Sequence, residues 1–146
     1  MATDRCFVCE KHAQGDAAEG GVLYQDHLVH AGHLHTMGGP PVYRGYLMVE
    51  TKRHVAGLGD LLDDEAAAVG RLVNRAARAL KECAGSGHVF AFVYGTGVPH
   101  LHVHLAPCYP DTPREFWGPR IREWPDAPTV DPVSMRQLVA DLRPCI

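Results

Sequence analysis

Residues 100–105 alternate strictly between histidine and an apolar residue, in the order His-Leu-His-Val-His-Leu. Side chains along a β-strand point alternately to the two faces of a sheet, so an extended chain here places His100, His102 and His104 on one face. The three apolar side chains then share the other face, where a hydrophobic core can bury them. The segment therefore predicts a strand that is anchored on one side and lines a pocket on the other.

The neighbouring segments predict further strands. Residues 88–94 are β-branched and aromatic, and a Gly-Thr-Gly turn connects them to the predicted strand over 99–107, so the two should pair as a hairpin. Residues 22–35 predict one or two short strands, and residues 43–51 predict another. Residues 6–21, by contrast, are polar and turn-rich.

Two helices are expected. Asp63 is a suitable N-cap for a helix that continues to about Glu82 with one apolar stripe, and Gly85 follows to end it. Residues 107–132 contain seven of the eleven prolines and should lack regular elements. Asp131 then caps a second helix, with Pro132 at its first position.

Length and composition place the chain among single-domain globular proteins. Its 146 residues suit one domain over residues 1–146, with 46% apolar and 21% charged residues. The net charge of −3 and the scattered Lys and Arg residues give no basic patch for nucleic acid. No apolar run approaches the roughly 18 residues of a membrane span, and Met1–Cys9 shows no secretory pattern. We expect a cytoplasmic protein that binds neither nucleic acid nor membrane.

The five cysteines are an odd number in such a chain, so we expect reduced thiols. Cys6 and Cys9 form a Cys-x-x-Cys pair, which can supply two of the four ligands of a zinc ion. The same pair is also compatible with ordinary buried thiols or with a redox motif.

Two chemistries suit the alternating histidines. A neutral imidazole is a good nucleophile near pH 7, which suits a two-step transfer through a covalent intermediate. Imidazole is also a common zinc ligand, so the same face can hold a metal. The spacing alone does not separate these alternatives.

Three motifs in order resemble the histidine triad (HIT) family. The run His-Leu-His-Val-His-Leu-Ala-Pro fits the family signature His-φ-His-φ-His-φ-φ, in which φ is apolar. Residues 45–65 resemble the strand-to-helix region that precedes this signature, and Cys6-Phe7-Val8-Cys9 is similar to the Cys-x-x-Cys near the start of many bacterial members. The resemblance covers about residues 6–110. It implies an α+β fold with a mainly antiparallel five-stranded sheet and a long helix, followed by the Pro-rich tail and a C-terminal helix, and a homodimer.

The resemblance also implies residue roles. The middle histidine, His102, would be the nucleophile on the α-phosphorus of a nucleoside phosphate derivative, with His104 on the phosphate or leaving-group side. In zinc-bearing members, the positions of His54 and His100 supply the ligands that complete the cysteine pair. A structural zinc would then be held by Cys6, Cys9, His54 and His100, with His12 as an alternative to His54.

Three departures from the family pattern bear on the substrate. The position that often carries an acidic ribose-binding residue falls near Leu34, which is flanked by His33 and His35. Thr96 stands in a Gly-Thr-Gly-Val stretch where a Gln and a Ser or Thr are common, so it has less reach toward a phosphate. Cys108 replaces a common Arg. We therefore consider His33, His35, Thr96 and His104 as substrate-binding candidates.

Other polar and aromatic residues have open roles. His27, His30, His33 and His35 can form a pocket wall, a second metal site or solvated surface. Trp117 and Trp124 in the tail suit packing, and alternatively base stacking. Arg114, Arg120 and Arg122 can be solvated surface or can replace missing phosphate contacts.

The leading interpretation is a nucleotide hydrolase or nucleotidyl transferase that forms a nucleotidyl-histidine, acting on a dinucleoside polyphosphate or a phosphoramidate. One alternative is a zinc hydrolase whose triad holds a catalytic metal. Another is a non-catalytic nucleotide-binding or scaffold protein with the same fold.

Overall fold

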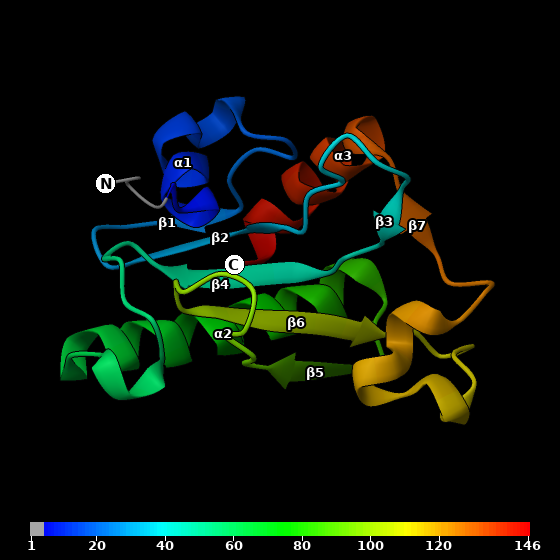
Figure 1. Ribbon diagram of the computed structural model, residues 1–146. Helices are drawn as coiled ribbons and strands as arrows, with labels where there is room; N and C mark the ends of the chain where they lie inside the picture. Colours follow the sequence, from blue (N-terminus) through cyan, green and yellow to red (C-terminus); the bar gives the residue numbers. More distant parts are fainter. Residues whose placement is uncertain (1–4) are drawn as a thin grey trace.

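The computed structural model describes residues 5–146, and it combines one five-stranded sheet with three helices among those residues (Figure 1). The helices are α1 (Phe7–Gln14), α2 (Asp63–Ala84) and α3 (Pro132–Leu142). The strands are β1 (Tyr24–Gln25), β2 (Val29–His33), β3 (Val42–Tyr43), β4 (Leu47–Thr51), β5 (His88–Phe92), β6 (His102–Cys108) and β7 (Thr129–Val130). The predicted α+β class is confirmed.

The main sheet is antiparallel throughout, in the order β1-β2-β4-β6-β5, while β3 and β7 pair separately. In this register Glu50 of β4 lies opposite His102 of β6, and Phe92 of β5 lies opposite His104. Residues directly opposite each other share a face of the sheet. The face that carries the histidines therefore also carries Glu50 and Phe92.

The two faces of the sheet are covered differently. On one face, α2 and α3 bury the apolar side chains of the central strands, which include Leu47, Val49, Val103 and Leu105. On the other face, α1 covers one end, and the tail that contains Ile121 packs on Tyr46 and Ala106 at the other end. His102 and His104 lie between these two covers.

The ends of α2 and α3 follow from local sequence. α2 begins at Asp63, but Leu62 rather than the predicted Asp63 is the N-cap residue, and the Glu65 carboxylate accepts a hydrogen bond from the Leu62 N–H at 2.9 Å. Gly85 ends α2 with φ of 76°, as predicted. Asp131 caps α3 by accepting from the Ser134 N–H at 2.8 Å, also as predicted. Among residues 5–146, every helix is too short or too polar to span a membrane.

The predicted strand over 43–51 is interrupted. Gly45 has φ of 79°, a left-handed conformation that favours glycine, and it separates β3 from β4. The Gly45 N–H donates to Nε2 of His33 at 2.9 Å, and Nδ1 of His33 donates to the Leu34 carbonyl at 2.8 Å. Both ring nitrogens of this fully buried histidine are therefore used within the fold.

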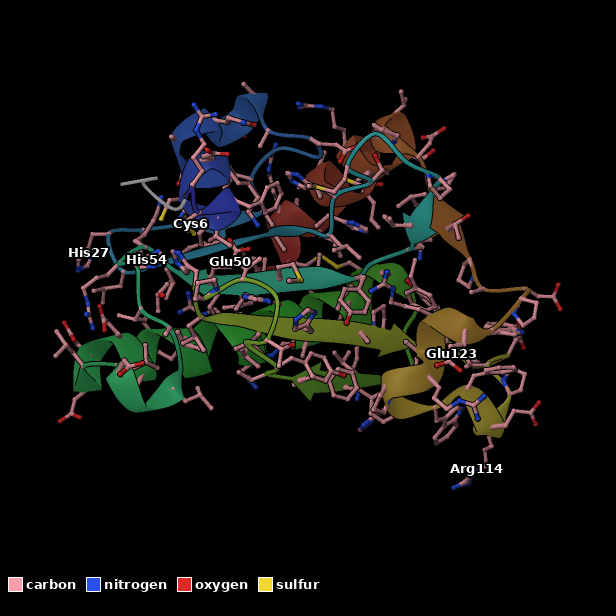
Figure 2. The ribbon with its side chains drawn as sticks, in the orientation of Figure 1. Cys6, His27, Glu50, His54, Arg114 and Glu123 are labelled. Atoms are coloured by element: carbon pink, nitrogen blue, oxygen red, sulfur yellow. A yellow bond between two sulfur atoms is a disulfide. The ribbon has the colours of Figure 1, made fainter. Side chains whose placement is uncertain are left out.

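The turn-rich segment over 6–21 contains helix α1, which the sequence analysis did not predict. A helix of eight residues is unstable alone, so its stability comes from tertiary contacts. Lys11 and His12 bond to the buried carboxylate of Glu50 on β4, and Figure 2 shows Cys6, His54 and Glu50 at the same end of the sheet.

Strand β6, which carries His102 and His104, starts later than predicted. β6 begins at His102, whereas a strand over 99–107 was expected, because the Leu101 N–H bonds to the Val55 carbonyl outside the sheet. The hairpin pairing of β5 with β6 is confirmed, but residues 93–101 form a long connection rather than a tight turn. His100 thus lies just before the strand instead of in line with the other two histidines.

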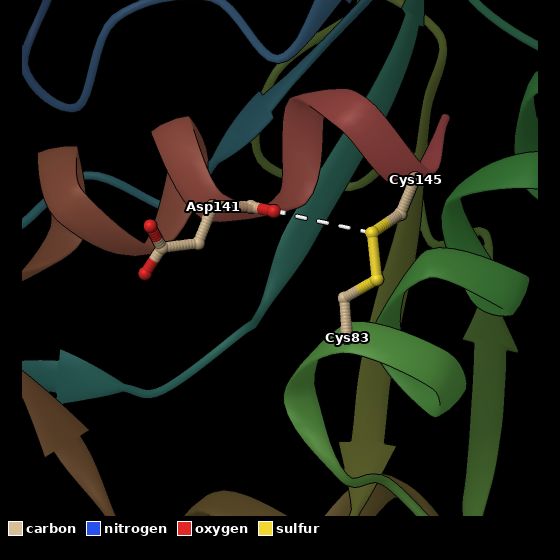
Figure 3. Close-up of a disulfide and its surroundings, with 3 residues drawn as sticks. All are labelled: Cys83, Asp141 and Cys145. Carbon is tan, nitrogen blue, oxygen red and sulfur yellow. Dashed lines mark hydrogen bonds between the residues drawn. A yellow bond between two sulfur atoms is a disulfide. The ribbon is translucent and has the colours of Figure 1, made fainter.

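The expectation that all five cysteines are reduced is wrong for two of them. Cys83 at the end of α2 and Cys145 after α3 form a disulfide across 62 positions of sequence (Figure 3). The bond fixes the C-terminal end of the chain to the long helix. Cys6, Cys9 and Cys108 are free thiols. The cytoplasmic location stays a prediction.

The hydrogen bonds of His33 predict a pH-dependent stability. Burial lowers the pKa of His33 from 6.5 to about 4. In the unfolded chain His33 therefore binds a proton below about pH 6.5, whereas in the folded chain it binds one only below about pH 4. The stability that neutral His33 contributes is complete above pH 6.5 and is lost as the pH falls through this interval. Between pH 7.5 and pH 5 we expect this residue to account for a loss of about 2 kcal/mol.

Urea denaturation at both pH values measures this effect. His33→Gln should be less stable at pH 7.5 but should lose about 2 kcal/mol less than the wild type on acidification. The exposed His27 gives the matched control, and His27→Gln should keep the full wild-type loss. An unchanged pH dependence in His33→Gln would contradict the assignment.

The disulfide predicts a redox-dependent stability. Because Cys83 and Cys145 close a long loop, Cys83→Ser should lower the free energy of unfolding by about 2–4 kcal/mol. A phosphine reductant should lower the urea midpoint of the wild type by a similar amount and leave that of Cys83→Ser unchanged. Titration of five free thiols in the denatured, unreduced wild type, instead of three, would show that the bond is absent.

Candidate functional site

His102 is held with one ring nitrogen occupied and the other free. Its Nδ1 lies 2.6 Å from the carbonyl oxygen of His100, an acceptor, so Nδ1 carries the proton. The lone pair of this imidazole is therefore on Nε2. His102 is half-buried and lines a cavity on the face of the sheet that carries the histidines. This arrangement fixes the orientation of the ring beside the cavity and leaves the Nε2 lone pair outside the hydrogen bond to His100.

His104 is the immediate neighbour of His102 on the same face. The two ring centroids are 4.8 Å apart, and Nδ1 of His104 lies 3.2 Å from the Tyr46 hydroxyl. A Tyr46 hydroxyl that donates to Nδ1 leaves the ring proton on Nε2, which is buried without a partner. Burial, with the charges of His102 and Arg122, lowers the pKa of His104 to about 4. His104 is thus a neutral hydrogen-bond donor near pH 7.

His100 turns away from the other two histidines toward the N-terminal helix. Its Nε2 donates to the Thr51 carbonyl at 2.7 Å, which leaves Nδ1 as the free nitrogen. That nitrogen lies 3.4 Å from Sγ of Cys6 and 3.5 Å from Sγ of Cys9. Nδ1 of His54 lies 3.6 Å from Sγ of Cys9.

These four side chains converge on one point. The ligand atoms of Cys6, Cys9, His54 and His100 all lie within 4.8 Å of one another. Two sulfur and two nitrogen donors at this spacing are a ligand set suited to tetrahedral zinc. The Thr51 carbonyl fixes the tautomer of His100, as an outer hydrogen-bond partner does in metal sites. The residues that the sequence placed together are therefore adjacent and fit a metal.

His12, the predicted alternative ligand, belongs to a different cluster. Its Nε2 donates to Oε2 of Glu50 at 2.8 Å, and Nδ1 of His30 lies 3.2 Å from the same oxygen. Lys11 bonds to the other carboxylate oxygen. Burial alone would raise the pKa of Glu50, but the contacts of its carboxylate with His12, His30 and Lys11 lower it well below its usual range.

The cavity beside His102 has a volume of about 190 Å³ and lies between α1, β2 and β4. Its walls are mainly apolar, and Lys11, Glu50 and His35 supply polar atoms. The lining residues include Phe7, Val8, Leu34, Met37, Met48 and Val98. An apolar cavity with a few fixed polar groups is typical of a small-molecule site. A second cavity of about 450 Å³ shares Leu34, His35 and Met37 with the first and reaches Arg122.

The other predicted substrate-binding residues do not all line the cavities. His35 lines both cavities. His33 also borders the first cavity, but its cross-strand partner Leu47 lies on the face packed by α2, and both His33 ring nitrogens bond to the backbone. Thr96 is exposed in the connection over 93–101 and is absent from the walls of both cavities.

The tail residues take mainly structural positions. Trp117 donates its Nε1–H to the Thr112 carbonyl at 2.9 Å and lies 6.4 Å from the Phe90 ring, centroid to centroid. Cys108 is buried in the hydrophobic cluster on the face of the sheet that carries the histidines. Trp124 is half-buried and lines neither cavity that contains His35.

The sequence analysis missed three residues of the site. Glu50 was treated as the end of an ordinary strand, yet its position directly after four apolar residues is a signal for a buried carboxylate. Lys11 and Tyr46 gave no such signal, because their partners are 39 and 58 positions away.

A protein-family model described as the HIT domain matches residues 17–111, which is more than half of the chain. A search of the curated proteins gave no match.

Solved structures share the fold at low sequence identity. A Zn-bound histidine triad family protein from Mycobacterium smegmatis is 21% identical, with a TM-score of 0.67 over 96% of this chain and 91% of that chain. A Hit-like protein from Bartonella henselae, described as involved in cell-cycle regulation and containing an unknown ligand, is 18% identical, with a TM-score of 0.62 over 86% of both chains. The NitFhit protein of C. elegans is 20% identical, with a TM-score of 0.64 over 87% of this chain but only 27% of that longer chain.

At these identities the structures show the fold alone, whereas the family model shows the family. Together with the three alternating histidines near its C-terminal end, the match over residues 17–111 establishes that this chain belongs to the histidine triad, or HIT, family.

Proposed function

We propose that the protein is a nucleotide hydrolase or nucleotidyl transferase in which His102 attacks the α-phosphorus of a nucleoside phosphate derivative. This proposal rests on the different states of the two ring nitrogens of His102. Nδ1–H is held by the His100 carbonyl, and the lone pair of Nε2 is left for a substrate in the adjoining cavity.

The proposed reaction has two steps, formation of a covalent intermediate and its breakdown. The Nε2 lone pair of His102 forms a bond to the α-phosphorus, and the bond from phosphorus to the leaving oxygen or nitrogen breaks, so the leaving group departs with that electron pair. The imidazole becomes a nucleotidyl-imidazolium, and the His100 carbonyl stabilises its Nδ1–H. Water, or another acceptor, then attacks phosphorus and releases its proton to solvent. The bond between phosphorus and Nε2 breaks, and its electron pair returns to Nε2 of His102, which restores the neutral imidazole.

The surrounding residues suit the remaining tasks. The apolar cavity takes the nucleoside, with His35 as its polar contact, and His104 donates from Nε2 to a phosphate or leaving-group oxygen. A neutral donor that is preorganised beside the reacting centre stabilises the charge that develops there. His33 contributes packing only, because both of its nitrogens are used in the fold. Thr96 reaches the phosphate only if the exposed connection over 93–101 closes.

We further propose that Cys6, Cys9, His54 and His100 hold a structural zinc ion. A complete set of four protein ligands leaves no position for substrate, so zinc would supply rigidity rather than chemistry. It would link α1, which forms one wall of the cavity, to the residue that precedes β6. The zinc-bound relative from Mycobacterium smegmatis supports a metal in this fold.

A homodimer is also proposed from the family resemblance. β5 is at the edge of the sheet, and His88 and Ala91 on it are exposed, so its free edge is available to a second copy.

A labelling experiment tests the nucleophile. Brief incubation with a dinucleoside polyphosphate that carries ³²P at the α-position should label the wild-type protein, and His102→Ala should neither become labelled nor turn over substrate faster than about one-thousandth of the wild-type rate. Acid-labile, base-stable label is expected, because a phosphorus–nitrogen bond to histidine holds it.

His88→Ala is the matched control, since His88 is an exposed histidine on the neighbouring strand. It should keep wild-type labelling. Labelling that persists in His102→Ala would exclude His102, and an unlabelled wild type that binds nucleotides would indicate a scaffold protein.

Metal analysis tests the zinc site. The purified wild type should contain about one zinc per chain, and Cys9→Ser should lose it. Cys108→Ser changes a free thiol outside the cluster and should retain zinc. His102→Ala should also retain zinc. Loss of the metal in His102→Ala would instead favour a catalytic metal held by the triad.

A further inference from the structure

Where the tail packs on the histidine-bearing face of the sheet, Arg122 is a cation without an acidic partner among residues 5–146. The Arg122 side chain is exposed and lines the second cavity. Among residues 5–146, no carboxylate oxygen lies within 4 Å of its guanidinium nitrogens. A cation that lacks an acidic partner and faces a cavity is free to bind an anion there.

Arg122 also lies next to the catalytic histidines. Its guanidinium is 5.4 Å from the centroid of the Tyr46 ring, and the hydroxyl of Tyr46 is 3.2 Å from Nδ1 of His104. Nε2 of His104 is buried and unpartnered. The same end of the site therefore holds one positive charge and, when Tyr46 donates to Nδ1 of His104, one buried Nε2–H that has no partner among residues 5–146.

The other tail arginines differ from Arg122. Arg120 is held by the Glu123 carboxylate at 2.8 Å, and its guanidinium lies over the Phe116 ring. Arg114 lies over the Trp117 ring and points away from the sheet into solvent (Figure 2). Neither lines the cavities that contain His35. Arg122 alone of these three is placed to meet a ligand.

We infer that the second cavity is an anion subsite in which Arg122 binds the phosphates beyond the α-phosphate, so that the protein selects substrates whose leaving group is a phosphate rather than an amine. This inference rests on the proposed function for its orientation, with the nucleoside in the cavity beside His102. The two cavities share Leu34, His35 and Met37, so they adjoin each other, and a single extended ligand that fills both would have His102 beside one part and Arg122 beside the other. Arg122 of the tail thereby supplies a positive charge that is missing at position 108, where the buried Cys108 replaces a common Arg.

Equilibrium binding tests the subsite without requiring turnover. The probes are adenosine 5′-monophosphate and the α,β-methylene analogue of adenosine 5′-triphosphate, whose α,β bridge resists cleavage. The wild type should bind the triphosphate analogue more tightly, and Arg122→Gln should reduce the ratio of the two affinities roughly 10-fold or more, as expected for a lost charge-assisted hydrogen bond. Arg122→Lys should restore part of the ratio.

Arg120→Gln is the matched control, and it should keep the wild-type ratio. A purely structural role for Arg122 would weaken both probes equally, and that result would overturn the inference. An unchanged ratio in Arg122→Gln, an equal drop in Arg120→Gln, or a wild type that does not prefer the triphosphate analogue would also overturn it. Binding that follows the expected pattern while His102 remains unlabelled would refute the proposed reaction and support the subsite.

Discussion

A single buried carboxylate joins helix α1 to the face of the sheet that carries the histidines. Glu50 is 1% exposed and accepts from His12, while Lys11 bonds to its other oxygen, so one negative charge on β4 receives two consecutive residues of α1. Removal of one partner of such a pair typically costs about 3–5 kcal/mol, because the other charge is left buried. Without this anchor, α1 would lack the contacts that place Cys6 and Cys9 beside His100, and the cavity would lose its Phe7 wall.

The order and type of the main elements could be predicted because they follow from local patterns. The apolar stripe of α2, the Asp131 cap of α3 and the alternation around Val103 each determine a structure within a few residues. Helix α1 could not be predicted in this way. Its partners on β4 are almost 40 positions away, and its own sequence resembles a loop.

The candidate site, too, could be predicted from the sequence only in part. Spacing and family resemblance indicated four metal-binding side chains, and the fold brings all four together. The strict alternation of the histidines suggested one continuous row, but His100 precedes the strand, and its ring points to the thiols rather than to the cavity. His33 looked like a binding residue because it is near His35 in sequence. Its opposite orientation follows from the pairing of β2 with β4, which a sequence pattern does not specify.

The bond between Cys83 and Cys145 makes a covalent ring of the second half of the molecule. This ring contains β5, β6, the Pro-rich tail and α3, so His102 and Arg122 belong to the same closed loop. A protease that cuts the exposed tail once would open the ring without releasing a fragment, since each piece would keep one of the two bonded sulfurs. The nicked protein would migrate as an intact chain until it met a reductant, and the tail could therefore be cleaved without separating it from β6.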